Sequence, residues 1–91
     1  MSLDALYTTI LDRKTNPKPG SYTNALLDAG PARLAQKVGE EAVETLVAAL
    51  AQDRARLVEE IADLAYHVLV LMAEKGIAPA DVAAELEKRR R

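Results

Sequence analysis

The chain has 91 residues, with 12 Lys or Arg, 14 Asp or Glu, one His, no Cys and a formal net charge of -2. So short a chain cannot supply two hydrophobic cores, and we expect one domain over residues 1–91. The lack of Cys excludes disulfides, thiolate zinc sites and cysteine nucleophiles. The slightly acidic balance argues against nucleic-acid binding, which depends on a basic surface that neutralises phosphates.

Two further features concern location and assembly. The first ten residues lack the basic start and the long apolar stretch of a signal peptide, so we expect a cytoplasmic protein. The longest apolar tract, residues 61–73, contains Asp63 and His67 and is shorter than the roughly 20 residues that span a bilayer, so no membrane partner is predicted. A core this small is marginally stable alone, so we expect an oligomer, and the apolar excess of residues 64–73 favours a homodimer.

The apolar fraction of 49% comes mostly from Ala and Leu, which favour helices, and it predicts an all-α protein. With Ser2 as N-cap, a first helix is expected to end near Lys14. Residues 16–20 include two prolines and a glycine, which predict an exposed loop. Ser21 and Thr23 are both candidates to cap a short second helix after this loop.

A helical pattern that begins at Pro31 continues to residue 75, which is longer than a helix of a globular protein usually is. The polar residues 52–54 offer a break, and Asp53 can cap the second half. Two long antiparallel helices are therefore predicted, with Gly76 ending the second. With the shorter helices before and after them, they form a compact bundle of four to five helices.

The last predicted helix begins at Pro79 and is expected to carry Val82 and Leu86 inward. It leads into a basic run at residues 88–91. Cations at a helix C-terminus are favoured by the macrodipole, so this run is typical of a solvated helix end. A contact with a phosphorylated ligand is the alternative role.

Acidic residues recur on one face of the first long helix. At about 100° per residue, one sector of about 100° contains Lys37, Glu40, Glu41 and Glu44. Roughly opposite lie the apolar residues Leu34, Val38, Ala42 and Leu46. Residues 46–51 are apolar on all sides, so the face that carries Glu44 continues into residues that we expect to be covered. The acids are thus predicted to border a cleft, although such a stripe is also typical of a solvent-exposed face.

On the second long helix, Glu60, Asp63 and His67 follow at i, i+3 and i+7 among apolar residues. A buried ionised carboxylate needs a cation, hydrogen bonds or water, and Lys37 and Arg56 neutralise only part of this charge. Oxygen ligands without Cys favour Mg²⁺ or Mn²⁺, and Mg²⁺ usually binds substrate phosphates together with a few carboxylates. The sequence therefore predicts a divalent-cation site with phosphate chemistry.

Other chemistries fit less well. A di-iron bundle needs Glu-x-x-His on two helices, whereas this chain has one His. The zinc motif His-Glu-x-x-His and the P-loop ending Gly-Lys-Ser/Thr are absent, and no nucleophile elbow supports a Ser-His-Asp triad. Purely structural roles stay open for several residues: His67 and Tyr66 in the core, Lys37 as a salt-bridge partner of Glu40 and Glu41, and Ser21 and Thr23 as caps.

The string Glu40-Glu41-x-x-Glu44, followed by Glu60-x-x-Asp63, resembles the signature of the all-α nucleoside triphosphate pyrophosphohydrolases, the MazG-like superfamily. Longer strings are similar to one branch, the phosphoribosyl-ATP pyrophosphohydrolases: Gly20-Ser21-Tyr22-Thr23, Lys37-Val38-Gly39-Glu40-Glu41-Ala42-Val43-Glu44 and Ala62-Asp63-Leu64-Ala65-Tyr66-His67. The resemblance covers almost the whole chain. It implies a Mg²⁺-dependent homodimer that hydrolyses phosphoribosyl-ATP between its α and β phosphates to phosphoribosyl-AMP and pyrophosphate, the second step of histidine biosynthesis.

The resemblance also implies roles for single residues. It makes Glu41, Glu44, Glu60 and Asp63 the metal ligands, with Glu40 beside them as the base or water-orienting residue and Glu59 as an alternative to Glu60. We further expect Lys37 and Arg33 to contact the triphosphate, Ser21 and Thr23 to donate hydrogen bonds to it, and Tyr22 to contact the base or ribose.

Two other functions remain open at this level. One is a general house-cleaning enzyme that hydrolyses noncanonical or excess nucleoside triphosphates. The other is a non-enzymatic helical dimerisation module whose acids are only surface charge. Substrate preference separates the first from the leading hypothesis, and metal dependence separates the second.

Overall fold

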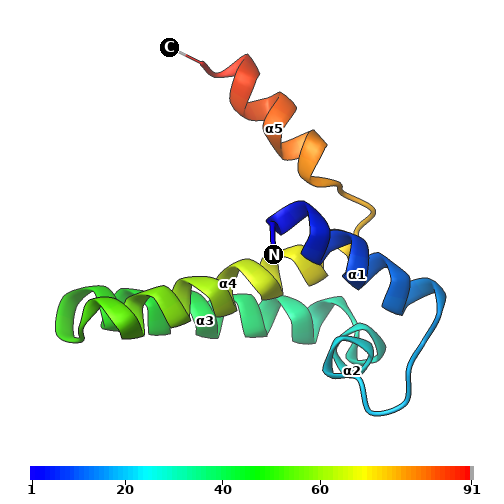
Figure 1. Cartoon of the computed structure of the whole chain (residues 1–91), viewed down its shortest axis with the longest axis horizontal. Coiled ribbons are helices and arrows are strands. Elements are labelled where there is room, and N and C mark those ends of the chain that lie inside the picture. Colours follow the sequence, from blue (N-terminus) through cyan, green and yellow to red (C-terminus); the bar gives the residue numbers. More distant parts are fainter. Residues whose placement is uncertain (91) are drawn as a thin grey trace.

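The computed structural model describes residues 1–90 and consists of helices joined by short loops (Figure 1). In this part of the chain there are five α-helices and no strand: α1 (Leu3–Thr15), α2 (Tyr22–Ala29), α3 (Pro31–Ala51), α4 (Arg54–Glu74) and α5 (Pro79–Lys88). The all-α prediction is therefore confirmed, and every predicted helix is present.

The helix starts follow local side-chain chemistry. Ser2, Ser21 and Asp53 lie in extended backbone just before α1, α2 and α4, and each side chain accepts a hydrogen bond from a backbone N–H in the first turn. These contacts satisfy donors that have no partner within the helix. Of the two candidate caps for α2, Ser21 has this role, whereas Thr23 lies inside the helix.

A single glycine joins α2 to α3. Gly30 ends α2 and precedes α3, with φ at +93°, a backbone conformation that L side chains rarely adopt. Pro31 then occupies the first position of α3, where its missing N–H costs nothing. This tight junction places α2 against the beginning of α3.

The two long helices α3 and α4 have 21 residues each and run antiparallel, side by side (Figure 1). α1 crosses the C-terminal part of α4, and α2 lies beside the start of α3 (Figure 1). The core lies at this end and consists of Tyr7, Ile10, Leu26, Leu34, Leu69, Val70 and Ala73. No helix within residues 1–90 is both long and apolar enough to cross a membrane.

The last helix does not pack as predicted. α5 leads away from the other four helices (Figure 1), and Val82 and Leu86 are exposed, Leu86 by 66%. The prediction that both residues point inward is therefore wrong for the single chain. The loop before α5 is attached to α1, because the Tyr7 hydroxyl donates a 2.6 Å hydrogen bond to the carbonyl of Ile77. This contact fixes the point from which α5 departs.

The far end of the long helices is also less covered than predicted. Within residues 46–51, Leu46 and Val47 are exposed and Leu50 is 89% exposed, although Ala48 is buried against α4. α1 and α2 cover only the opposite end of the α3–α4 pair (Figure 1). The expectation that these residues are covered is wrong for one chain by itself.

Candidate active site

The buried face of α3 is defined by residues seven apart. Leu34, Glu41 and Ala48 are all buried, and seven residues correspond to nearly two helical turns. Glu41 therefore lies in line with apolar residues, whereas Glu40 and Glu44 are exposed. The predicted division of α3 into an acidic face and an opposite apolar face is wrong in this respect, because α4 packs along the line that contains Glu41.

α3 and α4 bring three carboxylates together. One carboxylate oxygen each from Glu41, Glu60 and Asp63 lies within 4.8 Å of the others. Glu41 and Glu60 are only 7% and 5% exposed, whereas Asp63 is accessible to solvent. Glu59 lies outside this group and its side chain is 61% exposed. The three residues are called the acidic cluster below.

Two cations lie beside the acidic cluster, and each is shared. Lys37 Nζ lies 3.6 Å from Glu41 and 3.7 Å from Glu40. Arg56 contacts Glu60 at 2.6 Å and also pairs with Glu59. Its pKa is raised above the ordinary value, chiefly by the hydrogen bond to Glu59. With Asp63 included, five carboxylates share these two cations, so the charge is only partly neutralised.

Two oxygens of the acidic cluster have no partner. Glu41 Oε2 and Glu60 Oε2 are buried without a hydrogen bond, and a buried unsatisfied acceptor costs about 1–3 kcal/mol. A hard divalent cation with oxygen ligands would satisfy both atoms. The donor set therefore fits a hard divalent cation, which Glu41, Glu60 and Asp63 would hold.

A residue that the sequence interpretation missed links the two helices at this point. The Thr45 hydroxyl lies 2.8 Å from the carbonyl oxygen of Glu41 and 3.2 Å from that of Glu60. Its backbone position one turn after Glu41 was visible in the sequence, but its contact with the second helix was not. Thr45 therefore fixes the spacing of the helices beneath the acidic cluster.

Glu44 lies outside the acidic cluster but borders the same region. A pocket of about 300 Å³ is lined by Val43, Glu44, Val47, Gln52, Arg56 and Glu60. Glu60 belongs to both this pocket and the acidic cluster. The assignment of Glu44 as a fourth ligand stays a prediction.

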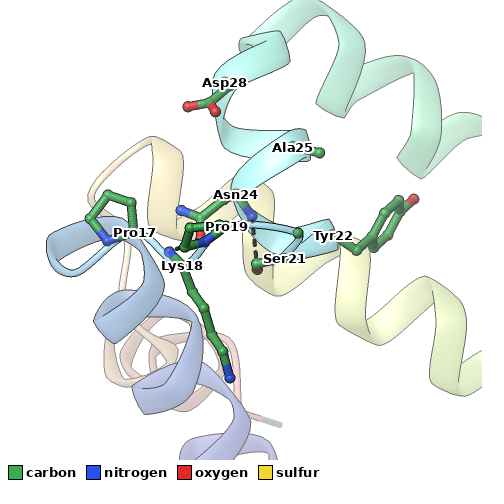
Figure 2. Close-up of a pocket in the computed structure, with 9 residues that line it drawn as sticks. Pro17, Lys18, Pro19, Ser21, Tyr22, Asn24, Ala25 and Asp28 are labelled. Carbon is green, nitrogen blue, oxygen red and sulfur yellow. Dashed lines mark hydrogen bonds between the residues drawn. The ribbon is translucent and has the colours of Figure 1, made fainter.

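A larger pocket of about 640 Å³ lies at the loop between α1 and α2 (Figure 2). Its lining includes Pro17, Lys18, Pro19, Gly20, Ser21, Tyr22, Asn24, Ala25 and Asp28. Two predicted substrate residues, Ser21 and Tyr22, are therefore present, and the sequence interpretation missed Lys18 and Asn24. A cation next to the N-terminus of α2 provides positive charge suited to an anionic ligand.

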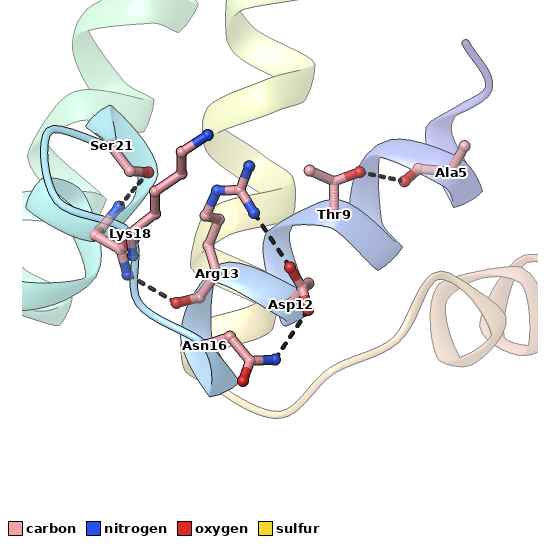
Figure 3. Close-up of polar contacts among 8 residues, drawn as sticks. Ala5, Thr9, Asp12, Arg13, Asn16, Lys18 and Ser21 are labelled. Atoms are coloured by element: carbon pink, nitrogen blue, oxygen red, sulfur yellow. Dashed lines mark hydrogen bonds and ion pairs between the residues drawn. The ribbon is translucent and has the colours of Figure 1, made fainter.

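Asn24 fastens this loop to the body of the protein. Its side-chain amide donates to the carbonyl of Arg13 at 2.7 Å and its side-chain oxygen accepts from the N–H of Lys18 at 2.9 Å. Just before this loop, Arg13 and Asn16 both donate to the carboxylate of Asp12 (Figure 3). The backbone N–H of Asn24 donates to Ser21 Oγ at 3.2 Å. Three contacts from Asn24 thus define the loop conformation.

The loop pocket is connected to α4 by two consecutive residues. The Tyr22 hydroxyl lies 2.9 Å from His67 Nε2, and the Thr23 and Tyr66 hydroxyls form a short hydrogen bond. Burial raises the pKa of Tyr66, so its hydroxyl keeps its proton at neutral pH. Figure 2 shows the Tyr22 side chain extending away from Pro17, Lys18 and Pro19.

Two other cationic regions were candidates to contact phosphate, Arg33 and the basic run at the end of the chain, and their described residues lie outside the acidic cluster and the two pockets. Arg33 is exposed in the first turn of α3 and lines none of the pockets described above. Arg89 and Arg90 pair with Glu85 and Glu87 on α5. The last residue of the basic run, position 91, lies outside the described residues.

The fold and the site together define an all-α protein with a carboxylate site suited to a divalent cation. Comparison with known proteins then identifies the family. The family model described as phosphoribosyl-ATP pyrophosphohydrolase matches residues 3–90. The chain belongs to this family.

Individual relatives agree along almost their full length. The phosphoribosyl-ATP pyrophosphatase of Sulfurisphaera tokodaii is 54% identical over 87 residues, which cover 96% of this chain and 93% of that protein. The proteins of the same name from Saccharolobus islandicus strain L.S.2.15 and Saccharolobus solfataricus are 52% and 51% identical over 89 residues. Each of these alignments covers 98% of this chain and 95% of the relative.

Proposed function

We infer that the chain hydrolyses phosphoribosyl-ATP to phosphoribosyl-AMP and pyrophosphate in histidine biosynthesis. Release of pyrophosphate from a triphosphate requires cleavage between the α and β phosphates. The observation that carries this function in the structure is the pair of buried, unsatisfied oxygens on Glu41 and Glu60 beside Asp63. Such a group serves no packing purpose, because it leaves two buried acceptor oxygens without a hydrogen-bond partner.

The acidic cluster is proposed to hold Mg²⁺, with Mn²⁺ as a possible substitute and Glu44 as an additional ligand. When bound, the ion neutralises charge on the phosphate oxygens and on the leaving pyrophosphate. Glu41 and Glu60 would hold the ion through Oε2, the oxygen of each carboxylate that has no partner. The two cations keep the carboxylates in place by their contacts at 3.6 and 2.6 Å.

The chain's other residues bind the substrate and handle the proton. Water attacks one of the two phosphorus atoms of the α–β linkage, and the bridging oxygen leaves with the other. Glu40, exposed beside Glu41, is proposed to accept the proton of this water at its carboxylate. Lys37 and Arg33 contact the triphosphate, Ser21 and Thr23 donate hydrogen bonds, and Tyr22 contacts the base or ribose.

A substrate comparison tests this function. Purified protein with Mg²⁺ should release pyrophosphate from phosphoribosyl-ATP, and a chelator such as EDTA should abolish the release. The same preparation should hydrolyse ordinary deoxynucleoside triphosphates far more slowly. A preference for the deoxynucleotides would favour a house-cleaning enzyme instead, and an activity indifferent to EDTA would contradict the metal site.

We also propose that the protein acts as a homodimer. The uncovered end of α3 and α4 exposes the apolar residues Val43, Leu46, Val47, Leu50, Val58 and Ile61. Residues 64–73, on which the sequence prediction of a dimer relied, contribute Leu69, Val70 and Ala73 to the core of the single chain instead. Exposed apolar residues such as those at the uncovered end are typical of a protein interface, and a second copy of the chain would cover them.

Replacing Leu50 by Glu should convert this dimer to a monomer, because a charge would then be buried at the interface. Sedimentation at micromolar concentration should show twice the mass of one chain for the original protein and the mass of one chain for L50E. Leu11→Glu, on a partly exposed residue of α1, is the matched control and should leave the mass unchanged. A monomeric mass for the original protein would refute the dimer.

The expectations from the sequence on domain, location and partners remain predictions. The whole chain, residues 1–91, is proposed to act as one domain in the cytoplasm, which suits an enzyme of amino-acid biosynthesis. Neither nucleic acid nor membrane is expected among its partners, and phosphoribosyl-ATP is the proposed ligand. Cell fractionation tests the location.

A further inference from the structure

His67 is a buried histidine to which the reaction assigns no task. It is 5% exposed and lies one helical turn after Asp63 on α4. Its Nδ1 atom lies 2.7 Å from the backbone carbonyl oxygen of Asp63, and its Nε2 atom lies 2.9 Å from the Tyr22 hydroxyl. The ring thus contacts the main chain of Asp63 and not its carboxylate.

The chemistry of these partners defines the direction of both hydrogen bonds. A carbonyl oxygen only accepts, so Nδ1 of His67 carries a proton and donates to Asp63. In the neutral ring Nε2 is then an acceptor, and the Tyr22 hydroxyl donates to it. The two ring nitrogens of His67 therefore join the start of α2 to the backbone of α4.

A parallel contact lies one residue away on each helix. Thr23 and Tyr66 join through their hydroxyls, and the Tyr22 and Tyr66 rings are stacked with centroids 6.1 Å apart. The His67 ring meets Tyr22 edge-on at 5.8 Å. Two consecutive residues of α2 are thus attached to two consecutive residues of α4, the helix that also carries Asp63.

We propose that His67 is a positioning residue that holds Tyr22, and with it the pocket at residues 17–22, in register with the acidic cluster on α4. This inference rests on the proposed function, in which Tyr22 and its neighbours bind the substrate. Without the Tyr22 contact, the pocket should bind the substrate and the transition state more weakly by the same amount. KM therefore rises while kcat stays nearly unchanged. Mg²⁺ binding is unaffected, because His67 does not touch the carboxylate of Asp63.

Two substitutions of His67 separate its two contacts. An Asn side chain can place its amide near the position of Nδ1 and keep the Asp63 contact, whereas a Gln side chain can place its oxygen near Nε2 and accept from Tyr22. H67N should therefore raise KM by about three- to tenfold, the effect of losing one hydrogen bond, and Y22F should do the same. H67Q should restore a KM close to the original value.

The double variant Y22F/H67N tests the link directly. Its KM should equal that of either single variant, since both remove the same contact. Tyr7→Phe is the matched control, because it also removes one tyrosine hydroxyl hydrogen bond, to Ile77, but away from the site. It should lower the melting temperature and leave KM unchanged.

Several results would overturn the proposal. These are additive KM effects in the double variant, equal KM values for H67N and H67Q, or a loss of the Mg²⁺-induced rise in melting temperature in H67N. If the original protein failed to hydrolyse phosphoribosyl-ATP, the proposed function would be wrong, but the link could still be measured. Non-additive unfolding free energies of Y22F and H67N would then support it, and additive ones would refute it.

Discussion

Replacing Glu41 by Gln should lower the turnover of phosphoribosyl-ATP about 100-fold or more, because the ion that we propose Glu41 to hold would supply several kcal/mol of charge stabilisation in the transition state. Asp63→Asn should have the same effect, since Asp63 belongs to the same cluster within 4.8 Å. Steady-state kinetics at saturating Mg²⁺ measure the loss. Glu44→Gln, measured alongside, tests whether Glu44 acts as a fourth ligand, for which a loss of similar size is expected.

The same substitutions should leave the metal-free protein as stable as before or slightly more stable. Three carboxylates lie close together and share two cations with Glu40 and Glu59, so removing one charge relieves repulsion. Melting temperatures with and without Mg²⁺ check this, and the rise caused by Mg²⁺ should be lost in Glu41→Gln. The matched control is Glu59→Gln, an exposed neighbour of Glu60 outside the cluster. Full turnover in Glu41→Gln would contradict the site.

Leu34→Ala should lower the free energy of unfolding by about 2–5 kcal/mol, the range for deleting a buried leucine side chain. Leu34 is 0% exposed and lies on the face of α3 where α1, α2 and α4 meet the core. Because small domains have a total stability of about 5–15 kcal/mol, this loss is a large fraction of it.

Urea unfolding followed by circular dichroism measures this change. Leu11→Ala is the control, because Leu11 is 40% exposed and does not belong to the core cluster. Its effect should stay within about 1 kcal/mol, as is usual for exposed positions. A similar loss in both variants would contradict the location of the core.

The helix boundaries could be predicted because their causes are local. Ser2, Ser21 and Asp53 accept hydrogen bonds from N–H groups three residues away, so a short stretch of sequence contains both partners. Pro31 and Gly30 act in the same way through their own backbone preferences. The choice of Ser21 over Thr23 needed the structure, because both have a suitable hydroxyl.

The grouping of the acids at the candidate site was partly predictable from the sequence. The acids on two successive helices predicted a cation site, and Glu41, Glu60 and Asp63 do come together. The sequence left Glu59 and Glu60 as alternatives, since neighbouring residues point only about 100° apart on a helix. The packing of α4 on α3 buries Glu60 and leaves Glu59 exposed.

From the sequence alone follow the helical class, the helix limits and the candidate residues for the chemistry, because these depend on side-chain type and on neighbours a few positions away. Only the tertiary structure decided that Glu41 lies on the buried face, that Thr45 and His67 join separate helices, and that Leu86 is uncovered. Periodicity gives the angle of a side chain around its own helix. It does not give the direction from which another helix approaches, and that direction decides which charges are buried together.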